Sequence, residues 1–292
     1  MTKRFFAVLL LLLLLTGCSG GEADSIDIAA TTGPVAQFAR AITDGSGLTV
    51  TQVISDSVSC LHDYTLSVRQ MQALEQADVV LISGAGLEEA MEDLLSQRAS
   101  VVDCSRDILL LEAETHEAHE HAHDHDHDHD PHIWLDPQRA ALMVANMTDG
   151  LCETYPQHEA LFRKNAETLI LRLQELKAYG DEALQSLSCR QLITFHDGFA
   201  YLADSFDLEI LAAIEEESGS EASAKDLTEM VHLVREHGLP AVFTERHGSV
   251  SAAGIICRET GISAYSLDMA MGGGDYFAAM TANIDALKEA LQ

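Results

Sequence analysis

The residues best suited to chemistry in this chain are histidines gathered in one run. Residues 116–132 read HEAHEHAHDHDHDHDPH and hold eight of the 14 histidines, interleaved with Asp and Glu. Imidazole is the commonest protein ligand for zinc and also suits copper and nickel, and His-rich tracts are typical of metal binding. A solvated loop without function is the alternative. The run predicts a metal-handling protein, with a secondary metal tract at His116, His119, His121, His123, His125, His127 and His129.

The exit of this tract has a different composition. The segment from Pro131 to Pro137 reads PHIWLDP and contains the only Trp of the chain together with two aliphatic residues. Such a composition is typical of an ordered, buried segment. We therefore expect His132 to be a structured group at the foot of the tract.

The N-terminus predicts where the protein works. Lys3 and Arg4 precede an apolar run from residue 5 to 15, which is too short to span a membrane but fits the core of a signal peptide. The run ends in LTGC, which resembles the lipobox of bacterial lipoproteins and implies cleavage before Cys18 and lipidation of that residue. We expect a signal peptide over 1–17, a lipid-anchored tether over 18–25 and an extracytoplasmic domain. A cytosolic protein with a buried N-terminal helix is the alternative.

Composition narrows the classes of ligand and partner. The formal charge of −30 argues against nucleic acid and anionic lipid surfaces, and it favours a cation. No phosphate-binding loop is present, and the Gly-rich run at 271–275 lacks the spacing of one. With 47% hydrophobic residues, 292 residues can form one large domain or two lobes.

Apolar runs of strand length alternate with helical patterns along the chain, which predicts parallel α/β sheets. One stretch of some thirty residues between 157 and 187 reads as a single long helix. We expect an N-terminal α/β lobe over 26–155 with a His-rich loop at 114–130, a linking helix over 156–188 and a C-terminal α/β lobe over 189–292. The expected strands are Ile26–Ala30, Leu48–Ile54, Val79–Ser83, Val101–Asp103, Gln191–Phe195, Leu208–Ala213, Ala241–Thr244 and Ser263–Leu267. The expected shorter helices are Val35–Ile42, Ser67–Gln76, Leu87–Gln97, Asp226–Glu236, Ser251–Thr260 and Tyr276–Leu291.

Four polar residues follow expected strands or end the tract. They are His62, His132, His196 and Asp268, two from each lobe. Ligands of open α/β sheets bind beyond the carboxyl ends of the strands, so these side chains can converge. Three imidazoles and one carboxylate form a four-coordinate site that suits zinc.

Cysteines outside the lipobox number five, and no two of them form a CxxC pair. An extracytoplasmic protein can form disulfides. Position along the chain favours Cys60 with Cys104 and Cys152 with Cys189, and Cys257 is then left over.

Three segments resemble the zinc/manganese-type solute-binding lipoproteins of ABC importers, the cluster A-I family. They are DPHIWLDP (130–137), TFHDGFAYLADSFDLEI (194–210) and SLDMAMGGGDYFAAMTANIDALKEAL (266–291). The resemblance covers nearly all of the mature chain. It implies two lobes bridged by one rigid helix, with His62, His132, His196 and Asp268 as the metal ligands. His at position 196, where manganese-selective members carry Glu, favours Zn²⁺ over Mn²⁺.

The chain also departs from the family pattern. Leu61 stands where the family has Pro before the first ligand, and Met269 stands where Pro follows the last one. Glu245 occupies a place where the family often has a Glu near the site, and we interpret it as a partner that orients a ligating imidazole. We interpret His247 as an exposed polar residue.

The expected function is therefore capture of Zn²⁺ between two lobes and delivery to an ABC permease and its ATPase, without catalysis. We expect the protein to act as a monomer. A metal-dependent hydrolase is one alternative, because three imidazoles with an open position can activate water. A surface metal buffer or adhesin that is not coupled to transport is the other.

Overall fold

The structure is a computed structural model that describes residues 26–54, 61, 64–98, 100–112, 129–215, 222–246, 250–272 and 274–292. Several predictions fall outside these residues. They concern the signal peptide, the lipidated Cys18, the tether, Cys60, His62, His247 and the tract from His116 to His127.

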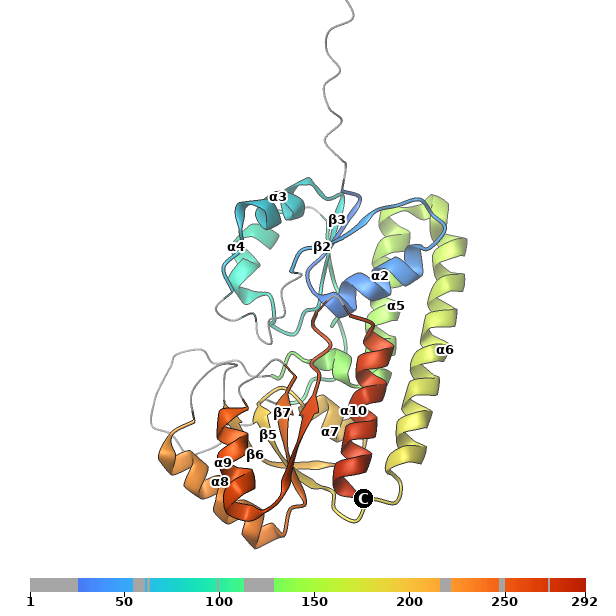
Figure 1. Cartoon of the computed structure of the whole chain (residues 1–292). Helices are drawn as coiled ribbons and strands as arrows, with labels where there is room; N and C mark the ends of the chain where they lie inside the picture. Colours follow the sequence, from blue (N-terminus) through green and yellow to red (C-terminus); the bar gives the residue numbers. More distant parts are fainter. Residues whose placement is uncertain are drawn as a thin grey trace, which may run out of the picture.

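Two four-stranded parallel sheets form the frame of the protein (Figure 1). The order in the N-terminal sheet is β2-β1-β3-β4, and the order in the C-terminal sheet is β6-β5-β7-β8. The first sheet consists of β1 (Ile28–Ala30), β2 (Val50–Gln52), β3 (Val79–Ile82) and β4 (Val101–Asp103). The second consists of β5 (Gln191–His196), β6 (Glu209–Glu215), β7 (Ala241–Glu245) and β8 (Ser263–Leu267). The predicted two-lobe α/β fold is confirmed, and all eight expected strands are present.

Two helices of the N-terminal lobe, α3 (Val68–Gln76) and α5 (Pro137–Thr154), begin at capping signals that the sequence carries. Ser67 and Gln70 form a capping box at the start of α3, and Asp136 caps α5 by accepting from the Gln138 amide at 2.8 Å. The expected single helix over 87–97 is wrong, because the chain forms a 3₁₀ turn followed by a short helix there. The elements are α2 (Gly33–Thr43), α3 (Val68–Gln76), η1 (Glu89–Met91), α4 (Glu92–Leu95), η2 (Ile133–Leu135) and α5 (Pro137–Thr154).

The C-terminal lobe contains the three expected helices and a short one that was not expected. The elements are α7 (Ala200–Ser205), α8 (Ala224–His237), α9 (Ser251–Thr260) and α10 (Tyr276–Leu291). A capping box at Ser223 begins α8, and Gly238 at a φ of 62° ends it in the left-handed conformation that favours glycine.

One long helix joins the lobes. Helix α6 (Glu159–Leu184) follows a 3₁₀ turn, η3 (Pro156–His158), and contacts α2 and α5 in one lobe and α10 in the other. Figure 1 shows it running along the height of the molecule. Its 26 residues correspond to about 39 Å at the usual helical rise. The exact lobe boundaries at residues 155 and 188 stay a prediction.

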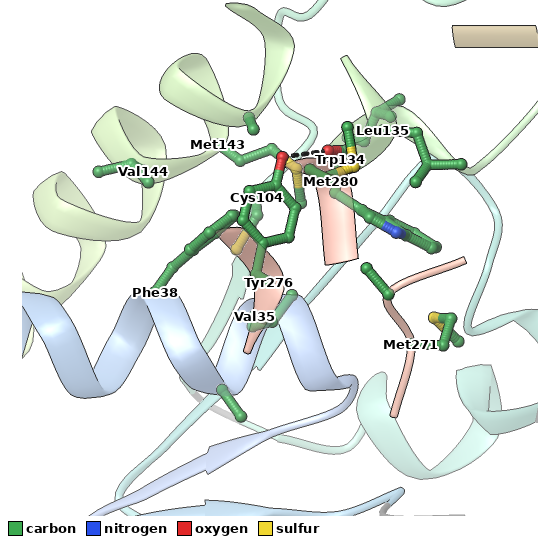
Figure 2. Close-up of a cluster of buried hydrophobic side chains, with 14 of the residues drawn as sticks. Val35, Phe38, Cys104, Trp134, Leu135, Met143, Val144, Met271, Tyr276 and Met280 are labelled. Carbon is green, nitrogen blue, oxygen red and sulfur yellow. Dashed lines mark hydrogen bonds between the residues drawn. The ribbon is translucent and has the colours of Figure 1, made fainter. Parts of the chain in front are cut away.

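A single buried apolar cluster extends through both lobes, and a smaller one lies between the C-terminal sheet, α8 and α9. The large cluster contains Trp134, which is fully buried, and the Tyr276 ring, which packs edge-on against Phe38. Figure 2 shows Tyr276 within this cluster and its bond to the Trp134 segment. The Tyr276 hydroxyl donates to the Trp134 carbonyl at 2.6 Å, so its polar atom is paired inside the core. The lobes thus share one core.

The expected disulfide between Cys152 and Cys189 is wrong, because both thiols are free. Cys152 lies in α5 beside the start of α6, and Cys189 follows the end of α6. A helix about 39 Å long separates them, whereas the Cα atoms of a disulfide lie within about 7 Å. Cys104 and Cys257 are also free; Cys60 lies outside the described residues.

None of the helices that the structure describes has both the length and the apolar character of a membrane span.

Candidate metal centre

His132 is held at the exit of the tract by its own neighbour. The residue is buried, and its Nδ1 lies 2.7 Å from Oδ1 of Asp130, which also accepts the His132 backbone amide at 2.8 Å. A carboxylate at Nδ1 favours the tautomer with the proton on that atom. The Nε2 atom then presents a lone pair, and among the described residues it has no hydrogen-bond partner. Imidazoles that bind metals in proteins usually have such a carboxylate partner at the other ring nitrogen.

His196 stands at the last position of β5 and is 2% exposed. Its ring centroid lies 5.6 Å from that of His132, and the two planes are nearly perpendicular. Gly198 packs against the His196 ring so closely that a Cβ there would lie 2.8 Å from its Nε2. The imidazoles of His132, from the N-terminal lobe, and His196, from the C-terminal lobe, therefore lie side by side.

Asp268 directly follows β8 and is clamped at its backbone. Its amide donates to Oδ1 of Asn283 at 2.7 Å, and its carbonyl accepts from the same side chain at 2.8 Å. One carboxylate oxygen accepts the Ala270 amide at 2.8 Å. The other oxygen pairs with Arg246 at 2.8 Å, so this carboxylate is already paired with a cation.

Glu245 ends β7 and is 6% exposed. It lies opposite Leu267 in the β7–β8 register, one residue before Asp268. Its role as a partner of a ligating imidazole stays a prediction.

Only part of the expected ligand set lies within the described residues. His132 and His196 are side by side, Asp268 is turned toward Arg246, and His62 is outside them. Within the described part of the chain, no three His, Cys, Asp or Glu side chains are grouped closely enough to hold a metal. The assignment of all four as ligands stays a prediction.

Two residues at this site were not singled out from the sequence. Asp130 belongs to the acidic repeat of the tract, and only its position two residues before His132 distinguishes it. Arg246 meets Asp268 because of the strand register, which the sequence pattern does not give.

Hydrogen bonds connect the two lobes close to His132 and Asp268. The Trp134 indole donates to the Met269 carbonyl at 2.8 Å, next to Asp268. The Tyr201 hydroxyl accepts the Leu111 amide at 3.0 Å and donates to the Asp130 carbonyl at 2.9 Å. Burial raises the pKa of Tyr201 to about 12, so the hydroxyl keeps its proton at neutral pH.

The foot of the tract is fixed to α7 of the C-terminal lobe through Tyr201 and Asp204. Glu112 and His129 form an antiparallel bridge across the two ends of the tract. Nearby, Arg139 forms ion pairs with Asp136 at 2.8 Å and with Asp204 of α7 at 2.7 Å. These contacts hold the foot of the tract beside His132.

The donor set fits a borderline divalent cation. Two buried imidazoles provide neutral nitrogen ligands, and the carboxylate of Asp268 provides charge. The buried Nε2 of His132 has no hydrogen-bond partner among the described residues, which costs free energy that a metal bond would offset. The types of side chain thus suit a divalent metal, while their assignment as ligands stays a prediction.

Comparison with known proteins gives a consistent result. The family model described as "ZnuA: Zinc-uptake complex component A periplasmic" matches residues 28–290. The zinc-binding lipoprotein AdcA of Streptococcus pneumoniae (strain ATCC BAA-255 / R6) is 28% identical over 295 residues, which covers 95% of this chain and 58% of AdcA. The chain thus spans little more than half the length of that relative.

Solved structures agree over almost the whole molecule. A crystal structure of ZnuA superposes with a TM-score of 0.80 at 26% identity, covering 92% of this chain and 100% of that one. The Zn(II)-bound ZnuA-like domain of Streptococcus pneumoniae AdcA superposes with a TM-score of 0.77 at 25% identity, covering 91% and 99%. The likeness extends over both lobes.

Proposed function

Because the chain belongs to the family of zinc-uptake complex component A proteins, we propose that it is the extracytoplasmic solute-binding component of a zinc ABC importer. It captures Zn²⁺ as cargo between its two lobes and delivers it to a membrane permease that a cytoplasmic ATPase drives. Relatives named as zinc-binding and the Zn(II)-bound ZnuA-like domain support zinc as the cargo.

The pair of buried imidazoles carries this proposal. His132 and His196 come from opposite lobes, and Asp130 holds His132 with Nε2 turned away from its partner. His62 and Asp268 complete the proposed four-coordinate site, with Glu245 as a further partner. Neutral imidazoles suit Zn²⁺ better than Mn²⁺, which prefers oxygen ligands.

The tract and the N-terminus have separate proposed roles. The histidines from His116 to His129 form a weaker, exchanging store whose carboxylates raise the local concentration of cations. Lipidation of Cys18 anchors the protein outside the cytoplasmic membrane, and the relative named as a lipoprotein supports this location.

A competitive zinc titration with metal counted by native mass spectrometry tests the proposal. The wild type is compared with His196→Ala, with a matched His237→Ala variant, and with a tract replacement. His237 is exposed at the end of α8 in the same lobe and serves as the control for loss of one imidazole. The replacement exchanges residues 114–128 for a short Gly-Ser turn. Glu112 and His129 are paired as neighbours on antiparallel segments, so a short turn can connect them.

We expect one chelator-resistant Zn²⁺ in the wild type, in His237→Ala and in the tract replacement. His196→Ala should weaken this site by at least about 100-fold, since losing a ligand exceeds the effect of losing an outer partner. If tight binding disappears with the tract and survives without His196, the proposed site is contradicted.

The two alternative functions differ in support. The relatives do not support a metal-dependent hydrolase, because their names refer to zinc binding. A surface metal buffer or adhesin that is not coupled to transport would pass the titration as well. Growth at low zinc separates this alternative from the importer. If the protein supplies an importer, a strain that carries His196→Ala should grow poorly at low zinc.

A further inference from the structure

The Arg246 guanidinium lies against the carboxylate of Asp268, with Nη1 2.8 Å from Oδ2. We infer that Arg246 is a competing cation: it occupies Asp268 in the metal-free protein, is displaced when zinc binds, and so weakens the site and speeds release of the metal. The inference rests on the proposed function, because it assumes that Asp268 is a zinc ligand.

The strand register builds this contact into the sheet. Strands β7 and β8 are parallel neighbours with Glu245 opposite Leu267, so Arg246 and Asp268 are the next residues along each strand. The Arg246 amide also donates to the Leu267 carbonyl at 2.8 Å. The guanidinium therefore reaches Asp268 from the adjacent strand end without any rearrangement of the backbone.

Asp268 does not need Arg246 to hold its position. Its backbone is bound on both sides by Asn283, and Oδ1 already accepts the Ala270 amide. Arg246 occupies the remaining oxygen, Oδ2, which is the one that these contacts leave for a metal. A positioning role would predict weaker metal binding when Arg246 is removed, whereas competition predicts tighter binding.

Exposure makes the exchange feasible. The Arg246 side chain is 60% exposed, and that of Asp268 is 21% exposed. The guanidinium can leave for water at little cost, because exposed ion pairs contribute only modestly to stability. A divalent cation on Asp268 would also repel the guanidinium, which cannot lose its charge. Metal binding and the Arg246–Asp268 pair should therefore exclude each other.

The test is a double-mutant cycle of zinc affinity and zinc dissociation. Arg246→Gln removes the charge, and Arg246→Lys keeps a positive charge on a different head group. Arg258→Gln is the matched control, because Arg258 is an exposed arginine on α9 of the same lobe. Each affinity is measured by competition with a chelator, and each dissociation rate by stopped-flow mixing with excess chelator, in the wild-type and Asp268→Asn backgrounds.

We expect Arg246→Gln to bind zinc about two- to fivefold more tightly than Arg258→Gln, the range for an exposed ion pair, with a slower dissociation rate. Arg246→Lys should lie between the wild type and Arg246→Gln. In the Asp268→Asn background the gain from Arg246→Gln should vanish.

Equal or weaker binding by Arg246→Gln than by Arg258→Gln would overturn the inference. So would a gain that persists in Asp268→Asn, because Arg246 would then act by long-range charge. If the wild type itself binds no zinc tightly, the proposed function fails before any variant is measured.

Discussion

The two sheets share one strand order, but different kinds of side chain follow the carboxyl ends of their strands. In each lobe the first strand of the sheet lies between the second and the third, and the fourth is at an edge. At the carboxyl ends of its strands, the N-terminal sheet has the buried Glu88, which lies between β3 and η1. The C-terminal sheet has His196, Glu245 and Asp268 at the corresponding ends. Among the described residues, two sheets of the same strand order thus present an internally paired carboxyl at one edge and candidate ligands at the other.

At the N-terminal edge, the buried carboxyl of Glu88 has its hydrogen-bond partners within its own lobe. Oε1 of Glu88 accepts the Thr31 hydroxyl at 2.6 Å and the Ser83 amide at 2.8 Å, and Oε2 accepts the Gly84 amide at 3.0 Å. Burial also raises the pKa of the Cys104 thiol well above its usual range, which keeps it protonated and disfavours metal binding. Within the same lobe, His132 has no hydrogen-bond partner at Nε2 among the described residues. A buried carboxyl that is fully paired thus has a structural role, whereas a buried imidazole with an available lone pair is a candidate ligand.

The largest expected effect that tests this contrast is a pH dependence of stability due to Glu88. Burial raises its pKa from 4.5 to about 7, against the opposing effect of the bonds from Thr31, Ser83 and Gly84. A carboxyl with a raised folded pKa binds more protons in the native state. Its contribution is therefore full below pH 4.5 and is lost as the pH rises through about 7.

Glu88→Gln should remove this dependence. The free energy of unfolding of the metal-free wild type, relative to Glu88→Gln, should fall by about 3 kcal/mol between pH 4.5 and 8. Urea unfolding at each pH measures it, with Glu92→Gln as the exposed control. Zinc affinity at a fixed pH should not change. A pH-independent difference, or a lost zinc site, would remove the distinction between the two edges.

A smaller effect is expected when the partner of His132 is altered. Asp130→Asn keeps the size of the side chain but loses the charge that holds the Nδ1 proton, 2.7 Å away. Zinc affinity should fall about 10- to 100-fold, the usual effect of removing an outer partner of a ligating imidazole. Asp149→Asn, an exposed change in α5, should leave the affinity unchanged in the same competitive titration. An unaltered affinity in Asp130→Asn would mean that His132 is not a ligand.

The smallest effect concerns the space beside His196. A Cβ at Gly198 would lie 2.8 Å from the His196 ring and from Cε of Met269, so Gly198→Ala must displace one of them. Overpacking of about 1 kcal/mol would weaken zinc binding about fivefold. Gly254→Ala is the matched control in the same lobe, since its Cβ meets only Arg258 Nη1 at 3.5 Å. Identical affinities for the two variants would show that the ring position does not matter.

Local patterns were sufficient to predict the sheets but not every helix. Most of the eight strands lie in short apolar or alternating runs bounded by polar residues, and these runs are visible without tertiary information. Helix α5 is not among the expected helices, although Asp136 and Pro137 form a typical helix start. The helix expected over 87–97 is broken because Glu88 turns inward to bind the Ser83 and Gly84 amides, which apolar periodicity does not reveal.

The site could be predicted only in part for a related reason. His132 and His196 were found because each ends a recognisable segment, and the structure places their rings 5.6 Å apart. The pairing of Arg246 with Asp268 depends on the β7–β8 register. The free thiols of Cys152 and Cys189 depend on the length of α6. Such long-range geometry is not encoded in local spacing.

Anomalous diffraction at the zinc edge, from crystals of the mature protein grown with one equivalent of Zn²⁺, locates the bound metal. We expect one peak between the lobes, about 2.0–2.2 Å from Nε2 of His132, a nitrogen of His196 and an oxygen of Asp268. A peak beside Glu88, or none between His132 and His196, would rule out the proposed site.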